Sequence, residues 1–324
     1  MRRAFLAAVA AAAVLILGNA PVAAQTYPIH PIKLLVGGAP GSVPDLVIRP
    51  IAERLSSALG QPVVVMNRPG AAGSIAIEML VQSPADGYTL AVATMSQAVF
   101  NSYLFSKLPY DPLRDLEPVA TLVVGAMIIA AHPSFPADNL QDLIRLAKDQ
   151  PGELLVAMPQ WGSPPHVVGL LLARSAGVEL RFVPHKVGPE ALNAVLGGQI
   201  PLLIDAPTAI SPQVAAGKLK ALVVTGSRRE AVLPGVQTAL EVGLNDLEGE
   251  AWIGLVAPAG TPRELVHRLN RELSLVLNVP DMQALMAKFS FRSLTKTPEE
   301  FRALLKADHD KWSSVIRGGG LKLD

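Results

Sequence analysis

The stretch LLVGGAPGSVPDLVIRP, residues 34–50, decides the fold class and contains the first candidate site. An apolar run that is typical of a buried strand enters a loop of small residues, and the loop enters a helix. Ser42 and Asp45 have the spacing of a capping box, with Ser42 as the N-cap residue and Asp45 as the third helical residue. Free N–H groups at such a helix start favour a carboxylate or a phosphate.

Glycines at positions 37, 38 and 41 allow a ligand to come close to the backbone of this loop. Their spacing matches neither the dinucleotide pattern G-x-G-x-x-G nor the phosphate-binding pattern G-x-x-x-x-G-K-[ST]. A plain strand-to-helix turn therefore stays an alternative for these residues taken alone. Pro50 should fall about eight residues into the helix, where it removes one backbone hydrogen bond.

Short apolar runs alternate with longer segments of helical periodicity from residue 29 onward. Nine apolar runs are predicted to be strands: 32–37, 62–66, 88–93, 119–132, 153–158, 180–184, 200–205, 219–226 and 252–258. Helices are predicted for 46–59, 140–148, 166–175, 189–197, 263–277 and 298–315. This alternation indicates an α/β protein of mostly parallel sheets with helices on both faces.

Two strand-rich segments, 118–131 and 252–258, are candidates for chain crossings between two domains. If both cross, domain 1 is discontinuous and consists of residues 25–123 and 255–324, and domain 2 is inserted as residues 124–254. A cleft then lies between the domains. Because ligands of open α/β sheets bind at the carboxyl ends of strands, the loops that leave the strands are the candidate site.

Residues 1–24 are predicted to be a signal peptide, because a basic start is followed by an apolar run and by the small residues Val22-Ala23-Ala24. The apolar run is shorter than the roughly 20 residues that span a bilayer, which disfavours a membrane anchor. The general secretory and twin-arginine routes both stay open, and either makes the protein periplasmic. The chain contains no cysteine, which excludes disulfides, lipid attachment through cysteine and thiolate metal sites.

The charge balance and the titratable residues exclude several function classes. With 28 basic and 27 acidic residues, the chain offers no sign of the basic patch that nucleic acid binding needs. Its six histidines are scattered, and neither H-E-x-x-H nor G-x-S-x-G occurs, so no catalytic, metal or cofactor site is predicted. Asp308-His309-Asp310 is predicted to be a solvated helix face.

Three more loops that follow predicted strands carry polar or small residues. Residues 67–74 form a second glycine-rich loop, and Thr94, Ser96 and Gln97 offer two hydroxyls and an amide in a third. A fourth loop, 158–163, ends at a helix start with Ser163 and His166. These two could act as nucleophile and base of a secreted hydrolase, but no third group that orients the histidine can be identified.

Ordered motifs extend over the whole chain after residue 24, and they include Asn67-Arg68-Pro69-Gly70, Leu196-Gly197-Gly198-Gln199 and Ala257-Pro258-Ala259-Gly260-Thr261-Pro262. Together with APGS at 39–42 and Gly162-Ser163, they resemble the periplasmic substrate-binding proteins of tripartite tricarboxylate transporters, the Bug family. The resemblance implies a flytrap of two α/β domains joined by two crossing strands and closing over a carboxylated ligand. It implies a non-enzymatic receptor without a cofactor, expected to be a monomer, whose transient partners are membrane transporter subunits.

The resemblance also implies most of the residues at the ligand, and the sequences of the first and fourth loops add Asp45 and Trp161. The first loop holds a carboxylate through backbone N–H groups and waters, and the other polar loops surround it. The candidate ligand-binding residues are Ala39, Pro40, Gly41, Ser42, Asp45, Thr94, Ser96, Gln97, Trp161, Gly162, Ser163, His166, Lys186 and Asp205.

The fourth loop departs from the family pattern Ser-x-Gly-x-Gly-Ser, because Met158 and Gln160 replace the first serine and the first glycine, with Trp161 beside them. We therefore predict a ligand with one carboxylate at the first loop and an apolar or aromatic remainder beside Trp161 and Met158. A binding protein that serves as sensor or carrier for a signalling partner stays an alternative to uptake.

Overall fold

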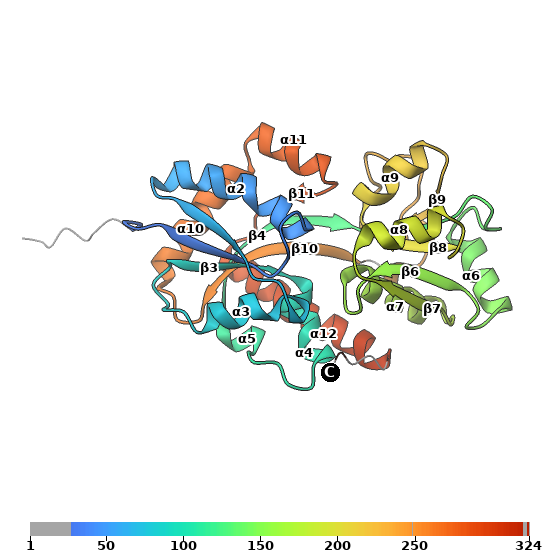
Figure 1. Ribbon diagram of the computed structural model, residues 1–324, viewed down its shortest axis with the longest axis horizontal. Helices are drawn as coiled ribbons and strands as arrows, with labels where there is room; N and C mark the ends of the chain where they lie inside the picture. The colour runs from blue at the N-terminus through green and yellow to red at the C-terminus, as the bar shows by residue number, and fades with distance from the viewer. Residues whose placement is uncertain (1–26, 248, 320–322, 324) are drawn as a thin grey trace, which may run out of the picture.

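The computed structural model describes residues 27–247, 249–319 and 323. The predicted signal peptide lies outside the described residues. Within them, the strands form two sheets, each covered by helices, and the two lie end to end along the long axis of the molecule (Figure 1). We call the two sheets with their helices the first and the second domain. No helix in the described ranges is long and apolar enough to cross a membrane.

The first sheet has the strand order β11-β4-β10-β3-β1-β2. Its strands are β1 (Ile32–Val36), β2 (Val63–Asn67), β3 (Thr89–Thr94), β4 (Leu116–Ala126), β10 (Glu250–Pro258) and β11 (Arg292–Ser293). Strands β2, β1 and β3 are parallel, which places their carboxyl ends at one edge of the sheet. The first, second and third loops start at this edge.

Helices cover both faces of the first sheet (Figure 1). One face carries α2 (Val43–Leu59), α10 (Arg263–Leu277) and α11 (Pro280–Lys288), and the other carries α3 (Ser74–Val81), α5 (Pro112–Asp115) and α12 (Pro298–Gly318). Helix α2 runs unbroken through Pro50 and buries Val47, Ile48, Ile51 and Leu55 against the sheet. This apolar stripe at helical spacing explains why the segment is a helix in spite of its prolines.

The second sheet has the order β7-β6-β8-β5-β9. Its strands are β5 (Ile128–Ala131), β6 (Leu155–Pro159), β7 (Arg181–His185), β8 (Leu202–Asp205) and β9 (Lys220–Val224). Helices α8 (Gly188–Leu196) and α9 (Pro207–Ala215) lie on one face, and α6 (Leu140–Asp149) and α7 (Pro164–Ala176) lie on the other (Figure 1).

The two sheets are joined through β4 and β10. Only Met127 separates β4 from β5, and β10 pairs antiparallel with β4 along the whole stretch from Glu250 to Pro258. Thr225 links the two connecting segments. Its hydroxyl donates to the carbonyl of Gly249 before β10 (2.7 Å) and accepts from the N–H of Met127 between β4 and β5 (3.0 Å). The predicted domain boundaries fall inside β4 and β10 and stay predictions.

Both sheets are mixed rather than mostly parallel. Antiparallel pairs involve β4, β10 and β11 in the first sheet and β5 in the second. The chain leaves the first domain along β4 and returns along β10, so these neighbours run in opposite directions. The two-domain α/β fold itself is confirmed.

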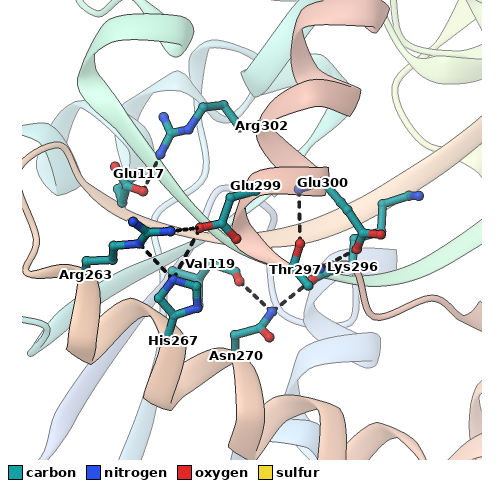
Figure 2. Close-up of polar contacts among 10 residues, drawn as sticks. All are labelled: Glu117, Val119, Arg263, His267, Asn270, Lys296, Thr297, Glu299, Glu300 and Arg302. Atoms are coloured by element: carbon teal, nitrogen blue, oxygen red, sulfur yellow. Dashed lines mark hydrogen bonds and ion pairs between the residues drawn. The ribbon is translucent and has the colours of Figure 1, made fainter.

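The C-terminal helix α12 is fixed to the first domain at its N-terminal end (Figure 2). A capping box joins Thr297 and Glu300. The Asn270 amide of α10 donates to the carbonyls of Val119 (2.9 Å) and Lys296 (2.8 Å), and Arg302 pairs with Glu117 of β4. These contacts place the start of α12 against α10 and β4.

The prediction of a solvated face at 308–310 is wrong for two of its three residues. The Asp308 carboxylate accepts from the indole Nε1 of Trp252 on β10 (2.7 Å), and burial raises the pKa of Asp308 above its ordinary value. His309 is 7% exposed. Only Asp310 faces solvent, where it pairs with Lys306 (3.1 Å). The partner of Asp308 comes from a strand 56 residues away, so helical spacing alone could not place it.

Candidate functional site

The first three loops meet at the carboxyl edge of β2, β1 and β3. Gly37 and Gly73 lie so close that a Cβ atom on Gly37 would come within 2.8 Å of the Gly73 backbone. The Gln97 amide fills the remaining space, and its Nε2 would lie 3.2 Å from the same Cβ atom. The glycines therefore allow close contact between loops as well as space for a ligand.

The first loop ends in an open helix start, but the predicted capping box is wrong. Ser42 has the extended backbone of an N-cap residue, yet its side chain makes no capping hydrogen bond. The Asp45 carboxylate instead accepts from the N–H of Gly41 (2.8 Å). The Ser42 Oγ is buried, and no group within the described residues hydrogen-bonds to it. Ala39, Pro40 and Gly41 are exposed, as a ligand-binding loop requires.

Asp45 is buried at 2% exposure, and its carboxylate is saturated by its own neighbours. Besides Gly41, it accepts from Arg49 (Nε, 2.9 Å) and from Asn67 Nδ2 (2.8 Å). Burial alone would raise the pKa of Asp45, but the hydrogen bonds from Arg49, Gly41 and Asn67 outweigh it and hold the pKa below its ordinary value. Asp45 thus orients the first loop rather than offering a free carboxylate to a ligand.

The third loop begins at the end of β3 and continues into a π-helix, η2 (Ser96–Phe100), which the sequence does not predict. The Gln97 Oε1 accepts from the N–H of Thr94 (2.8 Å) and from the Thr94 hydroxyl. Its Nε2 reaches the carbonyl of Ala72 in the second loop (3.4 Å). The Ser96 hydroxyl donates to the carbonyl of Gly162 in the second domain (3.4 Å), so loops of both domains meet here.

The fourth loop is a tight turn between β6 and α7. Gln160 and Gly162 have positive φ values of 41° and 71°, so Gln160 occupies a left-handed position that normally favours glycine. The Ser163 hydroxyl donates to the carbonyls of Pro159 and Gln160 (2.9 Å to the latter). It closes the turn on itself.

His166 is 1% exposed and lies behind the fourth loop. Its ring contacts Trp161 and Phe182 edge to face, and its Nδ1 accepts from the N–H of Gly162 (3.1 Å). Burial lowers the pKa of His166 from 6.5 to about 4, which keeps it neutral at physiological pH. Because Ser163 and His166 are each engaged with the backbone of the turn, they are not arranged as nucleophile and base.

The remaining predicted residues are Trp161 within this turn, Lys186 after β7 and Asp205 at the end of β8. Trp161 is 41% exposed. Lys186 is exposed, and its carbonyl accepts from the Gln160 amide (2.9 Å). Asp205, at the end of β8, accepts from the N–H of Ala206 (2.7 Å), and burial raises the pKa of its carboxyl from 3.8 to about 6. Met158 is fully buried, so the expectation that it lines the ligand site is wrong.

A metal site and a surface groove are the alternatives to the four loops. In the ranges that the structure describes, no group of three histidines and acidic residues could hold a metal ion. A groove of about 450 Å³ lies between α7, η3 (Asn245–Leu247) and α12, and none of the predicted ligand-binding residues lines it.

Two joined α/β domains with loops that meet between them define a binding protein of the periplasmic type. The chain belongs to the Tripartite tricarboxylate transporter family receptor family, whose model matches residues 47–321. It is 32% identical to Protein BugT of Bordetella pertussis over 305 residues, 94% of each chain. The family and the fold are therefore those of solute-binding proteins, and the resemblance is confirmed.

Solved structures support the same assignment. An R. palustris protein solved with adipate is 29% identical, with a TM-score of 0.80 over 92% of this chain and all of that one. MatC of Rhodopseudomonas palustris, solved with bound malate, is 31% identical, with a TM-score of 0.76 over 90% of this chain and all of that one.

Proposed function

We propose that this protein is an exported, monomeric receptor that captures a small organic anion between its domains and delivers it to a tripartite tricarboxylate-type membrane transporter. One observation carries the proposal: the buried hydroxyl of Ser42, which has no partner among the described residues, stands at the open start of the 17-residue helix α2. A ligand carboxylate there would accept from this hydroxyl and from the N–H groups of Val43 and Asp45, while Pro44 between them has no N–H. The adipate and malate of the related structures are both dicarboxylates, which supports an anionic ligand.

The loop surfaces favour a ligand with an apolar or aromatic part. Three exposed apolar side chains lie on or beside these loops. They are Val43 at the start of α2 (44% exposed), Trp161 in the fourth loop (41%) and Val187 just before α8 (49%). The Arg49 guanidinium beside the first loop is already paired with Asp45, so it does not supply a free positive charge for a second ligand carboxylate. We therefore place one ligand carboxylate at Ser42 and the apolar remainder near Trp161.

Calorimetric titration of ligand-stripped protein against aromatic monocarboxylates, adipate, malate and citrate tests the ligand class. We expect the aromatic or longer aliphatic acids to bind more tightly than citrate. Tight citrate binding without any response to aromatic acids would refute the apolar part of the proposal. No binding of any carboxylate would refute the carboxylate site itself.

Gly41→Val is expected to weaken carboxylate binding by about tenfold or more, because it strains the loop and blocks approach to its N–H groups. Gly60→Val is the matched control at the other end of α2. Both glycines have positive φ (80° and 68°), and a Cβ on either would meet no atom within 4 Å. Both variants should lose about 1–3 kcal/mol of stability, but only Gly41→Val should lose affinity. Equal affinities would remove the first loop from the site.

Ser163→Ala is expected to weaken binding by several-fold while the fold stays intact, because it removes the hydroxyl that closes the fourth loop. Dissociation constants measured by calorimetry check this expectation. Ester turnover that disappears in Ser163→Ala would instead favour a hydrolase.

A further inference from the structure

We propose that His309 is a positioning residue for ligand binding: its imidazole holds the π-helix η2 in the geometry that sets Ser96 against the fourth loop and the buried Gln97 between the first three loops. This inference rests on the proposed function, because it takes the third loop to be part of the ligand site. His309 lies on α12, more than two hundred residues from the loop that it supports.

Two backbone carbonyls of the π-helix accept hydrogen bonds from side chains outside it. The N–H of Asn101 bonds to the carbonyl of Ser96, five residues back, as the π geometry requires. The carbonyls of the next two residues each accept from a buried side chain. The Tyr110 hydroxyl donates to Gln97 (2.9 Å), and the His309 Nε2 donates to Ala98 (2.8 Å).

The protonation of the His309 ring follows from its partners. A carbonyl can only accept, so the hydrogen must be on Nε2, which faces Ala98. The other nitrogen, Nδ1, faces the Tyr103 hydroxyl at 2.9 Å. The Tyr103 hydroxyl also lies 3.1 Å from the main-chain carbonyl of His309. Tyr103 therefore orients the ring from the side opposite to Ala98.

Helix α12 is held from several directions, which gives the imidazole a fixed place. Its start is bound to α10 and β4 (Figure 2). Next to His309, Asp308 accepts from Trp252 on the crossing strand β10. Further along, the Ser314 hydroxyl accepts from Arg174 of α7 in the second domain (2.7 Å). A donor on this helix can therefore hold the π-helix without moving itself.

The π register matters for the ligand because it decides which way the loop side chains point. In this register Ser96 donates to Gly162 of the second domain, and Gln97 bridges Thr94 and the second loop. A buried carbonyl that loses its donor is costly, so a turn without His309 should shift towards other registers. Ser96 and Gln97 would then no longer keep these contacts, although the rest of the fold remains.

The test compares His309→Phe, which keeps a ring but has no donor, with His309→Gln, whose amide can donate to Ala98. Lys306→Ala on the exposed face of α12 is the control. We would measure amide hydrogen exchange of residues 94–104, the dissociation constant for adipate, and the melting temperature. For His309→Phe, we expect exchange in this segment to rise about tenfold and the adipate dissociation constant to rise by a similar factor. His309→Gln should stay within about twofold of the wild type in both.

Wild-type exchange in His309→Phe, or a His309→Gln variant as impaired as His309→Phe, would overturn the inference. If His309→Phe does not fold, His309→Asn takes its place with the same expected loss, because its amide is too short to reach Ala98. The exchange measurement does not need a ligand. If the wild-type protein fails to bind adipate, that result counts against the proposed ligand class, and the exchange results still decide whether His309 holds the π-helix.

Discussion

Asp45→Ala is expected to lower the free energy of unfolding by about 3 kcal/mol and to weaken ligand binding by more than about tenfold. The carboxylate is 2% exposed and accepts from Gly41, Arg49 and Asn67. Without it, the N–H of Gly41 and the amide of Asn67 lose an ionised acceptor, while the half-exposed Arg49 regains water. The first loop would then no longer hold its N–H groups in the direction that a carboxylate needs.

Asp142→Ala is the matched control for Asp45→Ala. Asp142 is also the third residue of a helix, α6, and it pairs with Arg145 (2.9 Å) at 24% exposure, away from the four loops. We expect this variant to lose about 1 kcal/mol of stability and no affinity. Urea unfolding and calorimetric titration measure the two quantities. An Asp45→Ala protein with wild-type affinity would show that the carboxylate does not orient the ligand loop.

The strands could be predicted from the sequence because burial leaves a strong local signal. Each predicted run forms a strand, and the run 119–132 forms both β4 and β5. Helices with a long apolar stripe, such as α2 and α10, are predictable for the same reason. Helix α9 is not, since Pro207 and Pro212 break its pattern and it buries few side chains. Tertiary packing rather than propensity decides such short helices.

The candidate site was only partly predictable, because hydrogen-bond partners come from distant parts of the chain. The glycine-rich loops follow strands and could be located by that order alone. Asp45 accepts from Asn67, which lies 22 residues away. Hydrogen bonds of this kind replace the capping box that the local spacing predicts. The π-helix accepts from Tyr110 at the carbonyl of Gln97 and from His309 at the carbonyl of Ala98, and no spacing rule predicts either partner. Met158 is the last residue of the predicted strand 153–158 and lies inside β6, where its side chain is buried instead of facing the loop.

Protonation of His166 is expected to remove about 3 kcal/mol of stability between pH 7.5 and pH 4. The imidazole is 1% exposed, and burial lowers its pKa from 6.5 to about 4. The unfolded chain therefore binds this proton at a higher pH than the folded protein does. The stability that the neutral His166 contributes is present above about pH 6.5 and is lost as the pH falls towards 4.

Asp205 has the opposite effect in an overlapping pH range, so the wild-type curve alone cannot report on His166. Burial raises the pKa of Asp205 from 3.8 to about 6, and the folded protein binds this proton more readily than the unfolded chain. Stability from Asp205 is thus lost as the pH rises through this range. The two slopes partly cancel in the wild-type protein.

Difference measurements separate the two groups. His166→Gln replaces the ring by an amide that can still accept from the N–H of Gly162 but does not titrate. Urea unfolding of the wild type and of this variant at several pH values between 4 and 7.5 should give free energies whose difference changes by about 3 kcal/mol across the range.

Asp205→Asn should steepen the loss of stability in acid, because it removes the opposing slope. A constant difference between wild type and His166→Gln at all pH values would mean that the imidazole behind the fourth loop titrates as if it were exposed, and that the tight packing of Trp161 and Phe182 around it does not exclude water.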